Sequence, residues 1–203
     1  MHIPFATPAW DLATQIWINQ GMRNPLLDFL MPVASNHWIL WGAGVLGFAW
    51  LFLKFGWKKA FTMFIVIATV GLADISCNVV KKHFGRVRPL NAIAGTYFRE
   101  DGKWQRRPQD YQQTETRGKS YVSAHSANSM AAAVMAMLLW PRLRPWLFLL
   151  PLITGFSRVY LGKHYPTDVM GGWLVGFAAA TVVAMAWLCV QRRFQTHQEQ
   201  RHG

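Results

Sequence analysis

Three short polar clusters hold most of the side chains that could do chemistry in this sequence. The first is KKHFGRVRP at residues 81–89, the second SYVSAHSAN at 120–128 and the third SRVYLGKHYPTD at 157–168. Arginine forks match phosphate oxygens and lysine adds a point charge, while phosphoryl transfer spreads negative charge over those oxygens. A divalent metal would instead need several carboxylates or thiolates. The clusters therefore predict phosphoryl chemistry without a metal.

The second cluster predicts an anion site at the beginning of a helix. Ser123 stands where an apolar segment begins, and serine is a favoured N-cap residue. The backbone amides that follow, starting with Ala124, then point outward and attract anions. His125 lies one turn inside this helix, next to the predicted anion site, where a catalytic role is possible. A purely structural histidine is the alternative.

The third cluster predicts a reactive imidazole. Arg158 falls inside the end of an apolar segment, where a guanidinium needs an anionic partner. His164 and Asp168 are four residues apart across a helix start, with Pro166 suited to its first turn. A carboxylate that holds one ring nitrogen fixes the imidazole tautomer and leaves the other nitrogen free to attack. A surface ion pair is the alternative for the same spacing.

The composition indicates an integral membrane protein. Of 203 residues, 52% are hydrophobic and only 15% are charged, against about 25% charged in ordinary soluble domains. Such a composition excludes disorder, and two cysteines exclude a disulfide scaffold. The net charge of +12 would suit nucleic acid, a membrane surface or an anionic substrate. Long uncharged runs decide against nucleic acid and for the membrane.

The elements that must position the clusters form an all-α, polytopic membrane helix bundle, with one domain over residues 1–203. Residues 1–37 are too polar to span, so we expect one or two interfacial helices there; a sixth span within 10–30 is the alternative. Residues 83–120 form one long loop. The expected spans are 38–53, 60–80, 121–141, 145–161 and 169–191.

Five spans place all three clusters and the N-terminus on one membrane face. The short loops on the other face carry a higher density of Lys and Arg, which favours that face as cytoplasmic. The long-loop face is then periplasmic or outside the cell. The protein is accordingly expected in the inner (plasma) membrane, with its active site facing outward.

Asp74, Asn78 and Lys81 fall on one face of the second expected span. A carboxylate inside a membrane helix is expensive and normally paired, so Asp74 is predicted to contact Asn78 and Lys81 and to position the lysine. A helix–helix hydrogen bond is the alternative for Asp74, and snorkelling is the alternative for the cations of 81–89. Pro89 is expected to stop this helix.

With these residues in view, the sequence resembles the type 2 phosphatidic acid phosphatase superfamily, which also includes vanadium haloperoxidases. The family signature begins with Lys, six residues and Arg-Pro, matched here from Lys81 to Arg88. It continues with Pro-Ser-Gly-His, which is degenerate here as Val-Ser-Ala-His at 122–125. It ends with Ser-Arg, five residues, His, three residues and Asp, matched in full at 157–168.

The resemblance implies a role for each matched residue. His164 is the nucleophile that forms a phosphohistidine, and Asp168 orients it. His125 protonates the leaving group and activates water. The phosphoryl oxygens are held by Lys81, Arg88, Arg158, Ser123 and the Ala124 amide, while Asp74, Asn78 and Ser157 support the site. No metal and no cofactor are implied.

The resemblance also implies a phosphorylated lipid substrate, with membrane lipids as the other partners and no nucleic acid. Undecaprenyl pyrophosphate is the expected substrate. Lipid A 1-phosphate, phosphatidylglycerol phosphate, phosphatidate and transfer of the phosphate to a second lipid are the alternatives. A transporter that binds an anion is the rival class, but the polar residues cluster at one depth and offer no path across the bilayer.

Overall fold

Helices make up most of the protein in the computed structural model, which describes residues 6–202. Of residues 37, 39–41, 43, 143, 145 and 194–202 it describes the backbone alone. In chain order the helices are α1 (Ala9–Ile16), α2 (Pro25–Ala34), α3 (His37–Phe55), α4 (Trp57–His83), α5 (Ala124–Leu139), α6 (Arg144–Leu147), α7 (Leu149–Tyr160) and α8 (Pro166–His202). A π-helix (Trp17–Gly21) follows α1, and 3-10 turns lie at Pro89–Asn91 and Pro141–Leu143.

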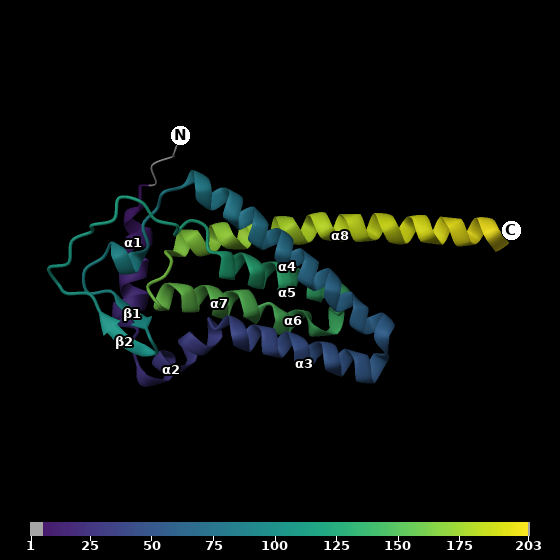
Figure 1. Ribbon diagram of the computed structural model, residues 1–203, viewed down its shortest axis with the longest axis horizontal. Helices are drawn as coiled ribbons and strands as arrows, with labels where there is room; N and C mark the ends of the chain where they lie inside the picture. The colour runs from purple at the N-terminus through teal and green to yellow at the C-terminus, as the bar shows by residue number, and fades with distance from the viewer. Residues whose placement is uncertain (1–5, 203) are drawn as a thin grey trace.

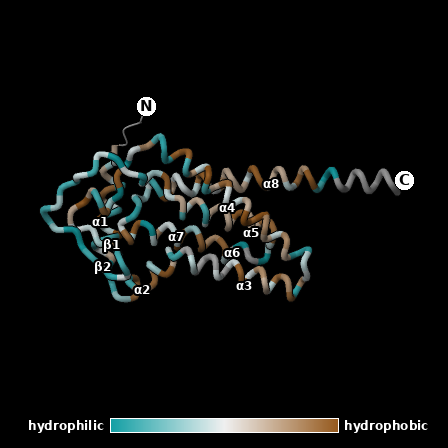
Figure 2. Tube along the Cα trace, in the orientation of Figure 1, coloured by the Kyte–Doolittle hydropathy of each residue, from teal (hydrophilic) through white to brown (hydrophobic). Residues whose placement is uncertain are grey.

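Two helices are long and apolar enough to cross a membrane: α4, and α8 over Pro166–Arg193. Their large apolar side chains are mostly exposed, Leu174 and Phe177 among them, which a soluble core helix would not show. Figure 2 shows the apolar colouring along the bundle and the polar colouring at one end. Three further apolar helices are shorter, at Pro25–Ala34, Gly44–Phe55 and Ala124–Leu139. The expected number of five spans therefore stays a prediction.

Helix α8 packs directly on the backbone of α5 at two glycines. A Cβ atom on Gly172 would lie 2.4 Å from the Ser123 carbonyl oxygen, and one on Gly176 would lie 2.2 Å from that of Ala127. Buried Ala127 and Ala131 continue the contact with small side chains. This glycine pair, four residues apart, lets the two helices approach closely. The approach brings the start of α5 beside the start of α8, where the second and third clusters stand.

Several helix boundaries differ from those expected from sequence. Helix α4 ends at His83 and not at Pro89, because Phe84 is extended and the chain then runs as irregular backbone toward the site. The expected span at 145–161 is broken into α6 and α7, and α8 continues past Gln191 to His202.

The long loop contains a β-hairpin, so the expectation of an all-α fold is corrected. Strands β1 (Tyr97–Glu100) and β2 (Lys103–Arg106) pair antiparallel, with Glu100 opposite Lys103. The turn is Asp101-Gly102, and both residues have positive φ, 49° and 78°. Two residues with positive φ are what the tightest hairpin turns require, and Asp-Gly is a favoured pair for them.

The N-terminal segment forms two short helices rather than one span. Helix α2 begins after Asn24, whose side chain accepts a hydrogen bond from the Leu27 amide at 2.9 Å, with a proline in the first turn. Each helix is far shorter than the roughly 20 residues that a span needs. Both lie at the hairpin end of the bundle, with α1 across it (Figure 1). Helix α1 exposes Trp10 and buries Asp11, and the π-helix that follows it exposes Trp17.

Candidate active site

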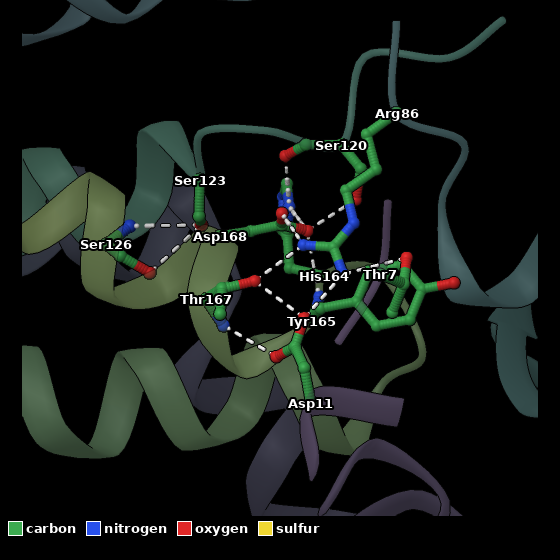
Figure 3. A network of polar contacts seen from close by, with 10 residues as sticks. All are labelled: Thr7, Asp11, Arg86, Ser120, Ser123, Ser126, His164, Tyr165, Thr167 and Asp168. Carbon is green, nitrogen blue, oxygen red and sulfur yellow. Dashed lines mark hydrogen bonds and ion pairs between the residues drawn. The ribbon is translucent and has the colours of Figure 1, made fainter. Parts of the chain in front are cut away.

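The fold brings the three polar clusters together at one end of the bundle. The Ser123 amide donates to the Asp168 carbonyl oxygen at 2.9 Å, which joins the second cluster to the third. The Arg86 Nη1 atom donates to the Asp168 Oδ1 atom at 2.7 Å, which joins the first cluster to the third. Figure 3 shows these residues around the start of α8.

His164 is buried with one ring nitrogen held and the other free. Its Nδ1 atom lies 2.8 Å from the Ser120 carbonyl oxygen. Because a carbonyl oxygen only accepts, Nδ1 carries the proton and Nε2 keeps its lone pair. No described residue forms a hydrogen bond with Nε2. Burial, together with the Arg158 and Arg88 charges, lowers the pKa of His164 to about 4 against the opposing effect of Asp168. The imidazole is therefore neutral at neutral pH.

Asp168 lies close to His164 without making the expected short contact. Its Oδ2 atom is 3.6 Å from Nδ1 of His164, beyond hydrogen-bond distance. Instead Oδ2 accepts from the Ser120 hydroxyl at 2.6 Å and from the Tyr165 amide at 2.9 Å. Ser120 thus stands between the two residues, with its hydroxyl on Asp168 and its carbonyl on His164. The tautomer is set first by this carbonyl, which carries no side-chain signature in the sequence.

Two arginines at the site have no acidic partner among the described residues. Arg158 is 6% exposed, and the Nε atoms of both Arg88 and Arg158 are buried without a hydrogen bond. Burial, and then the charges of Arg158 and Arg88, lower the pKa of Lys163. Lys81 also lies within electrostatic range of Arg88 and Arg158. We call Lys81, Arg88, Arg158 and Lys163 the open cation cluster.

Ser123 and His125 complete the site from the start of α5. Ser123 is the N-cap, and its hydroxyl oxygen accepts from the Ser126 amide at 3.4 Å and the Ser126 hydroxyl at 2.9 Å. The first helical amides, beginning with Ala124, have no carbonyl behind them in the helix. His125 lies within electrostatic range of His164 and of the cations Arg158, Lys163 and Lys81. An anion at this helix start would therefore meet an imidazole and the open cation cluster together.

The hydrogen bonds of the three supporting residues go to partners other than His164. Asp74 accepts from the side-chain amides of Asn78 at 3.3 Å and Asn128 at 3.2 Å. Among the described residues no ion pair joins Asp74 to Lys81, although Asp74 lies within electrostatic range of the lysine. The helix–helix hydrogen bond of Asp74 to Asn128 is present. The Ser157 hydroxyl donates to the Met31 carbonyl oxygen at 2.6 Å and ties α7 to α2.

Sequence reasoning missed a buried ion-pair network behind Asp168. Arg86 is one of the cations of 81–89, yet it is 4% exposed and bonds Asp168 as well as Asp11, the latter at 2.5 Å. Asp11 lies in the segment predicted to form interfacial helices. The available signal was its spacing from Gln15, because two polar residues four apart on a short amphipathic helix share one face.

The residues at this end are poorly suited to a metal ion. Within the described part of the chain, no group of three or more His, Cys, Asp or Glu side chains is placed to hold one. The acidic groups nearest His164 are already bonded to Arg86, Ser120 and Thr167. The remaining free groups are cationic, and they suit an anion.

The signature motifs lie within the part of the chain that matches a family model, that of the PAP2 superfamily, over residues 62–194. The match covers more than half of the sequence, so the chain belongs to the PAP2 superfamily.

Known phosphatases are similar in sequence to most of the chain. The lipid A 4'-phosphatase of Bacteroides thetaiotaomicron is 28% identical over 191 residues, covering 86% of this chain and 80% of the relative. The undecaprenyl-diphosphatase of Sulfolobus acidocaldarius is 32% identical over 130 residues, covering 62% of this chain and 55% of the relative. The prediction of a phosphatase is confirmed.

Solved structures share the fold. The crystal structure of LpxE from Aquifex aeolicus aligns with a TM-score of 0.68 at 21% identity, covering 90% of this chain and 99% of that chain. A transmembrane phosphatidylglycerolphosphate phosphatase of PAP2 type from Bacillus subtilis aligns with a TM-score of 0.59 at 21% identity, over 87% of this chain and 86% of that chain. The architecture is thus that of PAP2 membrane phosphatases.

Proposed function

We propose that the protein removes phosphate from a phosphorylated membrane lipid through a phosphohistidine on His164. One observation carries the proposal: a neutral imidazole with a free Nε2 atom lies within electrostatic range of buried Arg158 and half-buried Arg88, neither of which has an acidic partner among the described residues. A buried cation without a counter-charge is costly, and a phosphate group would supply the missing charge. Arginine forks suit the phosphoryl oxygens both before and during transfer.

The proposed reaction has two steps. In the first, Nε2 of His164 forms a bond to phosphorus, the bond to the lipid oxygen breaks, and His125 gives its proton to that oxygen. In the second, His125 takes a proton from water, the water oxygen bonds phosphorus, and the bond to Nε2 breaks to release inorganic phosphate. The Ser120 carbonyl keeps the Nδ1 proton in place throughout, so Nε2 remains the attacking atom. Neither step needs a metal ion.

Undecaprenyl diphosphate is the first substrate that we propose. It fits a cationic site with more than one free cation, and it is the substrate named for one of the relatives above. Lipid A is the second candidate, because a lipid A phosphatase matches a larger share of the chain. We further propose that the site faces the periplasm or the cell exterior, with α1 and α2 at the membrane surface.

The test is phosphate release by detergent-purified protein in EDTA, with undecaprenyl diphosphate, lipid A and phosphatidylglycerol phosphate assayed in parallel. We expect release that EDTA does not reduce and that His164→Ala abolishes. The kcat/KM values for the three lipids rank the candidate substrates. Activity that EDTA destroys, or that His164→Ala retains, would overturn the proposed chemistry.

A further inference from the structure

Asp11 of α1 reaches the catalytic end of α8 although 156 residues separate it from its partner there. It is fully buried. Its Oδ1 atom accepts from the Thr167 amide at 2.9 Å, and its Oδ2 atom accepts from the Thr167 hydroxyl at 2.6 Å. Thr167 directly precedes Asp168, so the carboxylate holds the first turn of α8 from outside the bundle (Figure 3).

Arg86 lies between two carboxylates. Its Nη2 atom bonds Asp11 at 2.5 Å and its Nη1 atom bonds Asp168 at 2.7 Å. The guanidinium also stacks 3.7 Å from the centre of the Tyr165 ring, which fixes its plane. With Asp168 alone, Arg86 would form a neutral pair. With both carboxylates the group of three keeps one net negative charge beside His164.

We propose that Asp11 is a positioning residue for the active site, which through Arg86 and Thr167 holds Asp168 against Ser120 and restores the negative charge that Arg86 would otherwise cancel. The inference rests on the proposed function of His164. It makes α1 part of the catalytic framework and not merely a surface anchor. Because α1 and the π-helix after it expose Trp10 and Trp17, Asp11 links an apolar outer surface to the catalytic end of α8.

The chain offers a matched control for this role. Asp28 is another acidic residue of the N-terminal segment, and it pairs with Arg23 at 2.5 Å. It also accepts from the Tyr160 hydroxyl at 2.5 Å. Asp28 takes part in none of the hydrogen bonds and ion pairs described for Asp168. Asp28→Asn therefore weakens the docking of the N-terminal segment without removing charge from the Arg86 group.

The experiment compares Asp11→Asn, Asp11→Glu and Asp28→Asn with the full-length wild type in detergent. For Asp11→Asn we expect kcat to fall about 10- to 100-fold, as loss of an outer hydrogen-bonding partner does at other reactive centres, with KM changed less than about 3-fold. Asp11→Glu restores part of kcat because it keeps the charge. Asp28→Asn keeps kcat within about 3-fold of wild type.

A second readout needs no substrate. Nitrogen NMR of labelled histidine reports which ring nitrogen of His164 is protonated, with His164→Ala as the assignment control. We expect an Nδ1 proton in wild type and a shifted or broadened His164 signal in Asp11→Asn, but not in Asp28→Asn.

The outcomes separate the two proposals. An unchanged kcat together with an unchanged His164 signal in Asp11→Asn would overturn the positioning role. Equal losses in Asp11→Asn and Asp28→Asn would overturn it too, because docking alone would then explain the effect. A wild type that releases phosphate from none of the lipids would overturn the proposed function, while the NMR comparison would still decide the role of Asp11.

Discussion

Two groups of charges lie next to each other at the loop end of the bundle, and they are organised in opposite ways. Around Arg86, every charge has a partner: Asp11, Asp168, Thr167 and Tyr165 surround the guanidinium. In the open cation cluster, neither Arg88 nor Arg158 forms an ion pair with a carboxylate in the described part of the chain. The paired group stabilises the packing of the site, and the unpaired group is available to bind an anion. Pairing therefore distinguishes cations that build the site from cations that bind substrate.

The largest effect is expected at His164, which faces both groups. His164→Ala removes the nucleophile and should lower kcat by about 10⁴-fold or more. The fold should remain, because the side chain packs at the end of the bundle and not between membrane helices. Phosphate release and thermal unfolding, measured on the same preparation, check the two statements. Substantial residual turnover would remove His164 from the role of nucleophile.

Asp168→Asn is expected to rank second. The variant removes a charge from the paired group and weakens the Ser120 bridge to His164, so kcat should fall by about 10²- to 10⁴-fold. Steady-state kinetics on the preferred lipid provide the measurement. A near-normal rate would mean that the Ser120 carbonyl alone holds the tautomer and that Asp168 serves the fold.

Two arginine variants test the comparison itself. Arg158→Met should lower kcat/KM about 10²- to 10³-fold, the typical loss for one charge-stabilising group. Its Tm should stay level or rise, because a buried charge without an acidic partner has gone. Arg86→Met should lower the free energy of unfolding by about 3–5 kcal/mol, because it leaves two buried carboxylates unpaired.

Thermal unfolding in detergent and kinetics on both variants give the answer. If Arg158→Met were the more destabilising of the two, the assignment of paired and unpaired groups would be wrong.

The pH dependence gives the smallest expected effect. His164 must be neutral to attack, and burial lowers its pKa from the usual 6.5 to about 4. Activity should therefore persist as pH falls below 6.5, and the acid limb of kcat/KM should lie near pH 4. Circular dichroism at each pH confirms that the protein stays folded. A limb near pH 6.5 would indicate an exposed imidazole.

The reacting residues could be predicted from the sequence because residue type and spacing identify them. His125, His164 and Arg158 belong to the signature motifs. Ser123 was predictable as an N-cap from local sequence, and the structure confirms this cap. The hairpin also has a local signal, because the Asp101-Gly102 pair favours a tight hairpin turn.

The framework of the site could not be predicted from spacing. Asp11 meets Arg86 across 75 residues, and such a contact depends on how α1 lies across the bundle. The Ser120 carbonyl is backbone, which every residue possesses, so no residue type marks its contact with His164. Both features depend on tertiary packing and not on a local pattern.

The central claim is that His164 carries the phosphate, and trapping the intermediate tests it most directly. Wild type and His164→Ala would be mixed with radiolabelled lipid phosphate in EDTA, quenched in alkali within one turnover, digested and mapped by mass spectrometry. The account predicts an acid-labile, alkali-stable phosphate on His164 in wild type and no label in the variant. Label on another residue, or turnover in EDTA with no labelled protein at any quench time, would contradict it.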